Sequence, residues 1–234
     1  MKLGKKNTTE DFYEDYFNEY EDALKEFCGG LEYIYTNGFE DEVYNYRQLI
    51  KFLGEKIVSE EQETEIKINN AWNADEDIRY QYSHVKSLRE FTLHATFISI
   101  HSMYEGRLRE YCVILAHYDK VKIRTDGHEN AAGLLNKIYK NVRPSEENKN
   151  KKLREFYCKI RNTLVHHKGY LNSKKEEDAA LMNKIKQNKY LGLTPCNVGL
   201  FDNKLHINKS IFLTDYLKLI SQDLEIISRS AMKL

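Results

Sequence analysis

An uninterrupted helical pattern between about Tyr82 and Tyr118 constrains the fold of this chain more than any other feature. Apolar residues recur there at three- and four-residue intervals, the period that places side chains on one face of an α-helix. The residues predicted to face a core are Leu88, Phe91, Ala95, Ile98, Met103, Leu108, Tyr111, Cys112 and Leu115. The chain has only two prolines, Pro144 and Pro195, so long segments can continue as helix without interruption.

Shorter periodic segments elsewhere predict further helices. They cover about residues 8–27, 40–58, 131–142, 145–168, 175–188 and 210–232, whereas the polar and acidic residues 59–78 indicate a loop or a weak helix. Residues 196–207 alternate between apolar and polar around Asp202-Asn203, which predicts a small hairpin. We therefore expect an all-α fold: an antiparallel helical bundle with an N-terminal helical extension and a small β-hairpin before the last helix.

The formal net charge of zero conceals a division between two parts of the chain. Residues 1–80 contain 20 Asp and Glu against 9 Lys and Arg, and the remaining residues contain 16 against 27. We therefore expect an acidic helical extension over 1–80 and a helical domain over 81–234. The basic residues are densest from Lys137 to Lys189. A basic surface is typical of proteins that bind polyanions, although a solvated lysine-rich face gives the same composition.

Several classes of protein and site are disfavoured. No apolar run approaches the roughly 20 residues that span a bilayer, and no apolar stretch follows the first lysines as in a secretory signal. The four cysteines form no CxxC pair, which fits a reducing cytoplasm. His94, His101 and His117 do not stand four residues apart, so we predict neither a metal site nor a cofactor. The 17 tyrosines are interpreted mainly as packing residues rather than base-stacking platforms.

One short segment contains residues suited to cutting RNA. Arg161, Asn162 and His166 lie in the predicted helix that ends before Gly169, and Asn162 and His166 share one helical face. A histidine near neutral pKa can take a proton from a ribose 2′-hydroxyl or give one to the leaving oxygen. Arg161 can bind the scissile phosphate and stabilise its developing charge, while Asn162 orients the imidazole or the phosphate. This chemistry requires no metal, because the attacking oxygen belongs to the RNA.

The spacing of arginine and histidine alone is weak support, because the chain repeats it. Arg79 precedes His84, and Arg89 precedes His94, at the same separation. We interpret the first of these pairs as a surface feature and the second as part of a structural core helix. The third pair differs in its context: a polar Asn162 directly after the arginine, tandem histidines, a basic neighbourhood and a following glycine.

The residues from about Tyr82 to Leu234 resemble a HEPN domain (higher eukaryotes and prokaryotes nucleotide-binding). Members of this family fold as a bundle of four to five helices. Their motif is an arginine, a polar residue, three further residues and a histidine, and Arg161, Asn162 and His166 match it. The resemblance implies that an upstream helix presents a polar or acidic residue toward the motif, and Glu105 is the candidate. It also implies a homodimer in which two motifs form one composite cleft.

The resemblance further implies an endoribonuclease of antiviral defence, abortive infection or a toxin–antitoxin system, with tRNA or mRNA as substrate and an antitoxin or other regulatory protein as partner. Lys159 and Lys168 are the predicted RNA-binding residues, and His167 and Tyr170 are possible supporting residues. One branch of the family has a regulatory tyrosine two positions after the histidine, whereas this chain has Lys168 there. Regulation of that kind is therefore in doubt.

A second class of function stays open from the sequence. A HEPN-like module without catalysis would bind RNA or a protein partner and retain the same fold. In either case the acidic residues 1–80 are a candidate for an interaction or self-shielding element that competes with RNA for the basic surface. Residues 1–80 match no family that we can name.

Overall fold

The computed structural model describes residues 40–70, 76–117, 131–142 and 151–231. These residues form six helices and three short strands, so the described part of the chain is mostly helical, as expected. The predicted helix at 8–27 and the helix start at Ser145 lie outside the described residues. In chain order the elements are α2 (Glu40–Asn70), α3 (Glu76–His117), α4 (Ala131–Val142), α5 (Lys151–His167), β1 (Tyr170–Leu171), α6 (Glu176–Lys186), β2 (Leu191–Val198), β3 (Phe201–Ile207) and α7 (Ile211–Ala231).

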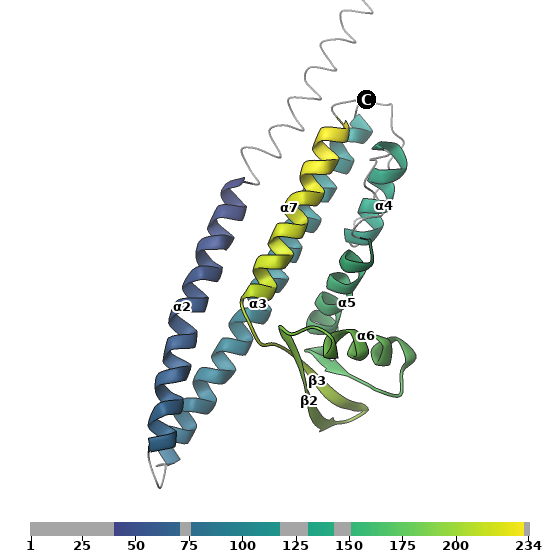
Figure 1. Ribbon diagram of the computed structural model, residues 1–234. Coiled ribbons are helices and arrows are strands. Elements are labelled where there is room, and N and C mark those ends of the chain that lie inside the picture. Colours follow the sequence, from purple (N-terminus) through teal and green to yellow (C-terminus); the bar gives the residue numbers. More distant parts are fainter. Residues whose placement is uncertain (1–39, 71–75, 118–130, 143–150, 232–234) are drawn as a thin grey trace, which may run out of the picture.

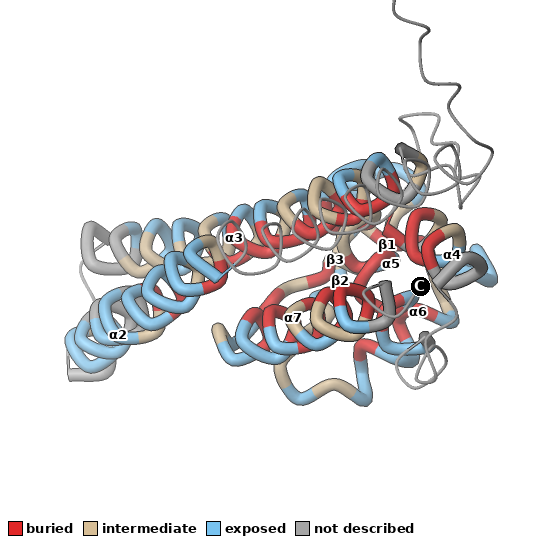
Figure 2. The backbone as a smooth tube through the Cα atoms, turned by 90° about the horizontal axis from the view of Figure 1, so that it is seen from above, coloured by how far each residue is buried: buried red, intermediate tan, exposed pale blue. Residues whose placement is uncertain are grey.

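The 42-residue helix α3 is the longest described element, and the others are arranged around it. One part of α3 runs antiparallel to α2, and the remainder packs against α4, α5 and α7 (Figure 1). Buried residues concentrate where α3, α5 and α7 meet, whereas α2 and the adjoining part of α3 are mostly exposed (Figure 2). Val43 and Ile50 of α2 nevertheless belong to the same hydrophobic core as the C-terminal helices.

An aromatic cluster lies at the centre of this core. Phe97 from α3 packs 5.1 Å from Tyr216 and 5.4 Å from Phe212, both on α7, measured between ring centroids. Tyr157 from α5 stacks on Tyr216 at 4.4 Å. Large aromatic side chains contribute most of the burial energy in such cores and pack in defined tilted or offset geometries. This cluster therefore fixes α5 relative to α3 and α7.

A buried ion pair supports the same junction. Arg154 of α5 donates from Nε and Nη2 to the two carboxylate oxygens of Asp223 on α7, at 2.6 and 2.7 Å. Tyr104 of α3 donates its hydroxyl to the same carboxylate at 2.9 Å. A two-pronged arginine–carboxylate contact is geometrically specific, so it sets the rotation of α5 as well as its position.

The strands form a three-stranded antiparallel sheet in the order β1-β3-β2. The predicted hairpin is present, but its turn is at Gly199-Leu200 and not at Asp202-Asn203. Asp202 lies within β3, and its carboxylate accepts the backbone N–H of Ser173 at 3.0 Å, which connects the β1–α6 loop to β3. Gly199 adopts a φ of +61°, a conformation that favours glycine.

The sequence left residues 59–70 open between a loop and a weak helix. They continue α2 as helix, because Glu, Gln and Lys there favour helix and no proline or glycine interrupts them. One prediction about α3 was wrong. Leu88 and Phe91 were expected in the core but are 49% and 70% exposed. The first half of α3 has neighbours on only part of its circumference, so the helical period places more apolar residues there than the fold covers (Figure 2).

Candidate functional site

Helix α5 ends directly after the predicted motif. Lys168 has a φ of +52° and Gly169 a φ of +86°, and the Gly169 N–H donates to the Thr163 carbonyl at 3.0 Å. This bond is typical of a helix end that closes through left-handed residues. A side chain at Gly169 would meet the Leu205 carbonyl oxygen at 3.3 Å, so glycine allows β3 to approach the helix end closely. The sequence predicted the glycine stop but not the left-handed lysine.

The structure holds Arg161 in a defined, largely buried position. Its side chain is 21% exposed, and its Nη2 lies 3.6 Å from a carboxylate oxygen of Glu105 on α3. Its Nη1 donates to the Asn162 side-chain oxygen at 3.1 Å. Its buried Nε has no hydrogen-bond partner among the described residues, so the guanidinium has unused donor capacity. Glu105, which was expected to face the motif, therefore lies against Arg161.

Glu105 connects the candidate site to three parts of the fold. Its Oε1 accepts the N–H of Ala131, the first residue of α4, at 3.0 Å and lies 3.3 Å from Nε2 of His101. The other ring nitrogen of His101 lies 2.5 Å from the Tyr216 hydroxyl. A carboxylate at a helix N-terminus is favoured by the helix dipole. Glu105 thus has a structural role in capping α4, whatever it contributes to chemistry.

The environment of Glu105 also lowers the pKa of its carboxyl. Burial alone raises that pKa, but the hydrogen bond and charge of His101, the Ala131 N–H and the charge of Arg161 outweigh burial. Glu105 is therefore ionised at neutral pH and presents a negative charge to the guanidinium. This charge favours the position of Arg161, and it also partly offsets the positive charge of the guanidinium.

His166 and its neighbours lie on the outside of the molecule. His166, His167 and Lys168 are exposed, and none of the described residues forms a hydrogen bond or ion pair with the His166 imidazole. Lys159 is also exposed, one helical turn before Thr163, whose hydroxyl bonds back to the Lys159 carbonyl at 2.9 Å. The motif thus combines a guanidinium with defined partners and an imidazole that solvent can reach.

Sequence reasoning missed one aromatic residue beside the motif. The Phe201 ring at the start of β3 lies 6.0 Å from the His167 ring and 5.9 Å from the Tyr170 ring. No pattern in the sequence indicates that a residue of the hairpin would contact the end of α5. The connection arises because β1 follows α5 directly and pairs with β3, with Tyr170 opposite Lys204.

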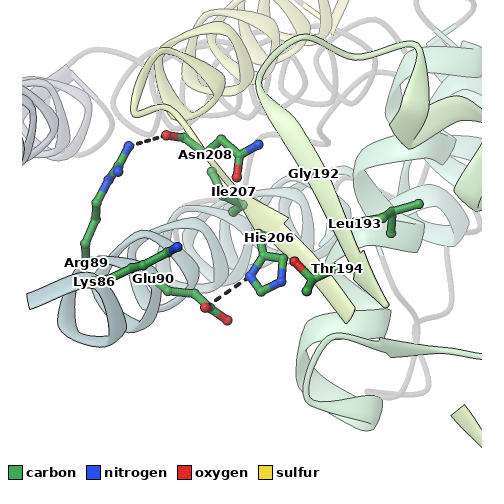
Figure 3. Close-up of a pocket in the computed structure, with 9 residues that line it drawn as sticks. All are labelled: Lys86, Arg89, Glu90, Gly192, Leu193, Thr194, His206, Ile207 and Asn208. Atoms are coloured by element: carbon green, nitrogen blue, oxygen red, sulfur yellow. Dashed lines mark hydrogen bonds and ion pairs between the residues drawn. The ribbon is translucent and has the colours of Figure 1, made fainter. Parts of the chain in front are cut away.

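Arg89, the arginine of the second arginine–histidine pair, lies at a different junction, between α3 and the hairpin (Figure 3). The Arg89 guanidinium donates to the Asn208 backbone carbonyl at the end of β3. Glu90 pairs with Nζ of Lys204 at 2.7 Å and with Nδ1 of His206 at 3.0 Å. These contacts attach the hairpin to α3, which agrees with the structural interpretation of the Arg89 pair.

A pocket of about 230 Å³ adjoins this junction. It is lined by Lys86, Arg89, Glu90, Gly192, Leu193, Thr194, His206, Ile207 and Asn208. The His206 contact, opposed by burial and reinforced by Lys204, lowers the pKa of Glu90 to about 2. Burial, with the positive charges of His206 and Lys204, lowers the pKa of His94 to about 4 against the opposing charge of Glu90. Both shifts follow from a polar cluster enclosed between helix and sheet.

Across residues 40–70, 76–117, 131–142 and 151–231, no three His, Cys, Asp or Glu side chains form a group suited to binding a metal. No helix within these ranges is long and apolar enough to cross a membrane. Comparison with protein-family models, with curated proteins and with solved structures gives no match. The resemblance to HEPN domains therefore rests on the motif and on the helical pattern that surrounds it.

Proposed function

We propose that the chain is a metal-independent endoribonuclease of the HEPN type. One observation carries the proposal: Arg161, fixed by Glu105 and Asn162, lies on the same helix as the exposed imidazole of His166. Proton transfer requires a histidine within reach of substrate, and stabilising a phosphorane requires a guanidinium in a fixed position. The last turns of α5 provide both groups.

In the proposed reaction the RNA supplies its own nucleophile. His166 removes the proton from a ribose 2′-hydroxyl, and the 2′-oxygen forms a bond to the adjacent phosphorus. The bond from phosphorus to the 5′-oxygen breaks, and that oxygen leaves with a proton. The products are a 2′,3′-cyclic phosphate and a 5′-hydroxyl. Arg161 stabilises the extra negative charge on the phosphoryl oxygens, and Asn162 keeps the guanidinium or the imidazole oriented.

The surroundings of the motif favour a polyanionic substrate. Residues 159–175 contain Lys159, Arg161, Lys168, Lys174 and Lys175 and no Asp or Glu. A cluster of cations at a helix end and loop attracts phosphates and increases the rate of encounter with RNA. The resemblance also implies a homodimer, in which His166 of the second subunit supplies the proton for the leaving oxygen. It further implies a cytoplasmic role in antiviral defence or in a toxin–antitoxin pair.

One specific observation favours a second candidate function, an RNA- or protein-binding module without catalysis. Glu105 caps α4 and pairs with Arg161, so a structural role alone accounts for the position of the guanidinium. In that case His166 is an ordinary exposed histidine at a helix end. The acidic residues 1–80 fit either candidate as an element that competes with RNA. Residues 40–80 include α2, which contributes Val43 and Ile50 to the core, and the start of α3. The test is therefore a deletion of residues 1–39 alone, which should raise RNA affinity.

The chain offers a matched control that separates the two functions. Purified protein is incubated with RNA in EDTA, beside His166→Ala, Arg161→Ala and His84→Ala variants. His84 is also an exposed histidine that follows an arginine at the same spacing. We expect the His84→Ala variant to cleave like the parent protein, and the other two variants to lose at least a hundredfold in rate. RNA binding without cleavage by the parent protein would favour the second candidate.

The ends of the products test the chemistry independently of the variants. We expect 2′,3′-cyclic phosphate ends, and no cleavage of RNA whose 2′-hydroxyls are methylated. Fragments with 5′-phosphate ends, or equal cleavage by the His166→Ala variant, would contradict the proposed site.

A further inference from the structure

Three aromatic rings from three elements form a small cluster at the end of α5. His167 ends α5, Tyr170 begins β1, and Phe201 begins β3. The Phe201 ring lies between the other two, 6.0 Å from His167 and 5.9 Å from Tyr170. We call these three residues the aromatic cluster.

The aromatic cluster is not part of the hydrophobic core. His167 is exposed, and Tyr170 and Phe201 are only partly buried. The neighbouring hairpin turn also exposes apolar side chains, with Leu200 80% and Val198 45% exposed. Tyr170 and Phe201 thus keep part of their surface accessible close to the exposed side chains of the turn, and clustered apolar surface of this kind is typical of a site that a ligand covers. Exposed faces of π systems are suited to stacking against another flat, unsaturated ring.

The charges beside the cluster indicate the class of ligand. Residues 159–175 carry five Lys or Arg and no acid, and His167 and Tyr170 lie within that stretch. Lys168 is exposed between these two rings in the sequence. A ligand with both flat rings and negative charges matches a polynucleotide, in which a base stacks on the rings while the phosphates meet the lysines. Arg161 is paired with Glu105, and Asp202, the acid next to Phe201, accepts hydrogen bonds from Ser173 and Asn203. The four lysines of this stretch are exposed, and a purely apolar partner would gain nothing from them.

We propose that the aromatic cluster is a nucleobase-binding subsite, and that the substrate is therefore single-stranded RNA. This inference rests on the proposed function: His167 follows His166 at the end of α5, so the subsite would take a base near the cut, on a neighbouring face of the helix. A base within a duplex has both faces stacked and cannot lie on a protein ring, whereas a single strand presents its bases. Stacking on an aromatic residue contributes about 1–3 kcal/mol per base, or roughly 5- to 150-fold in Kd.

The test uses binding to the full chain with cleavage removed by His166→Ala. In that background the Kd is measured for a fluorescent single-stranded oligoribonucleotide and for the same sequence in a duplex. Phe201→Leu retains an apolar side chain of similar size but removes the π face, so it tests stacking with little risk to folding. Phe201→Trp retains and enlarges the π face. Phe91→Leu is the matched control, because Phe91 is 70% exposed on α3.

We expect Phe201→Leu to weaken single-strand binding about tenfold, Phe201→Trp to equal or exceed the parent, and Phe91→Leu to have no effect. The fluorescence of the Phe201→Trp variant, in a Trp72→Phe background, should be quenched by single-stranded RNA and not by the duplex. Equal binding by Phe201→Leu and the parent would overturn the inference, as would equal affinity for duplex. A change of oligomeric state in Phe201→Leu with unchanged RNA binding would also overturn it, in favour of a protein contact.

These outcomes are independent of the cleavage assay. If the parent does not cut RNA but single-strand binding depends on Phe201, the aromatic cluster is supported and the proposed enzyme is not. If the parent cuts RNA and Phe201→Leu has the parental Kd, the enzyme is supported and the aromatic cluster is not.

Discussion

Glu105 of α3 and Arg161 of α5 meet across the helical interface, with 3.6 Å between Oε2 and Nη2. The other oxygen of the same carboxylate accepts the first N–H of α4. One side chain therefore couples the candidate catalytic arginine to the position of a third helix. A residue that acts in this way is a positioning residue, and its loss should affect both stability and the chemical step.

The first prediction concerns Glu105→Gln. The amide retains the shape of the side chain but loses the charge that favours Arg161 and the α4 N-terminus, so we expect the free energy of unfolding to fall by about 2 kcal/mol. Urea unfolding with an unchanged m-value measures this loss. In the proposed enzyme, kcat should fall more than KM rises, because Arg161 is displaced from the position that stabilises the transition state.

Glu110→Gln is the control for this prediction, on the same helix. Glu110 pairs with Arg107 at 2.7 Å, but its side chain is 49% exposed, so its charge should contribute less than about 1 kcal/mol. Equal stability losses in Glu105→Gln and Glu110→Gln would show that Glu105 does not organise the site.

The second prediction concerns the buried ion pair that orients α5. Asp223→Asn leaves Arg154 charged and buried with a weaker partner, so we expect a loss of about 3–5 kcal/mol. Glu225→Gln, which disrupts the pair with Arg229 on the exposed side of α7, should cost less than about 1 kcal/mol. Thermal unfolding followed by circular dichroism compares the two variants, and a similar Tm for both would contradict the assigned role of Asp223.

The third prediction is a loss of stability in acid that arises at the junction of α3 and the hairpin. His94 has a pKa of about 4 in the folded chain and 6.5 as its ordinary value, so the unfolded chain takes up a proton first as the pH falls from 6.5 to 4. Glu90 has a pKa of about 2 against 4.5, so its stabilising contribution is present above pH 4.5 and is lost toward pH 2. Each group gives a slope of at most about 1.4 kcal/mol per pH unit.

Two substitutions separate these contributions. His94→Gln should flatten the dependence of unfolding free energy on pH between 6.5 and 4, and Glu90→Gln should flatten it between 4.5 and 2. His84→Gln, at an exposed histidine on the same helix, is the control. An unchanged slope in His94→Gln would mean that the buried imidazole is not responsible.

Much of the helical fold could be predicted from local patterns. The predicted bounds of α4, 131–142, agree with the structure, because strong apolar periodicity and the proline that follows indicate where the helix begins and ends. Leu88 and Phe91 show the limit of predicting buried residues from helical periodicity. Periodicity identifies the apolar face of a helix, but whether another element covers that face depends on tertiary packing. For the polar residues 59–70 the pattern did not decide between a loop and a weak helix, because helix propensity acts there without an apolar stripe.

The candidate site could be predicted only as far as one helix extends. Arg161, Asn162 and His166 are neighbours within α5, so their spacing alone places them together. Phe201 could not be found in the same way, because it meets His167 and Tyr170 only through the pairing of β1 with β3. Strand register depends on long-range contacts such as that of Asp202 with Ser173, which no local pattern encodes.

The last prediction concerns Lys168, which has a left-handed backbone with a φ of +52°. This conformation costs a residue with a Cβ about 1–2 kcal/mol, and glycine avoids most of that cost at the expense of some chain entropy. We expect Lys168→Gly to stabilise the fold by about 0.5–1 kcal/mol. Lys168→Ala loses the same charge but retains the strain, so its stability should stay close to that of the parent.

Both variants should weaken RNA binding by a similar factor if Lys168 contacts phosphate, and the salt dependence of binding should decrease by about one counterion. A strained lysine that binds RNA would be an instance of stability given up for function at a site. Urea unfolding and RNA titrations at several salt concentrations measure the two effects separately. Parental RNA affinity in both variants, with stabilisation by Lys168→Gly, would assign Lys168 to helix termination alone.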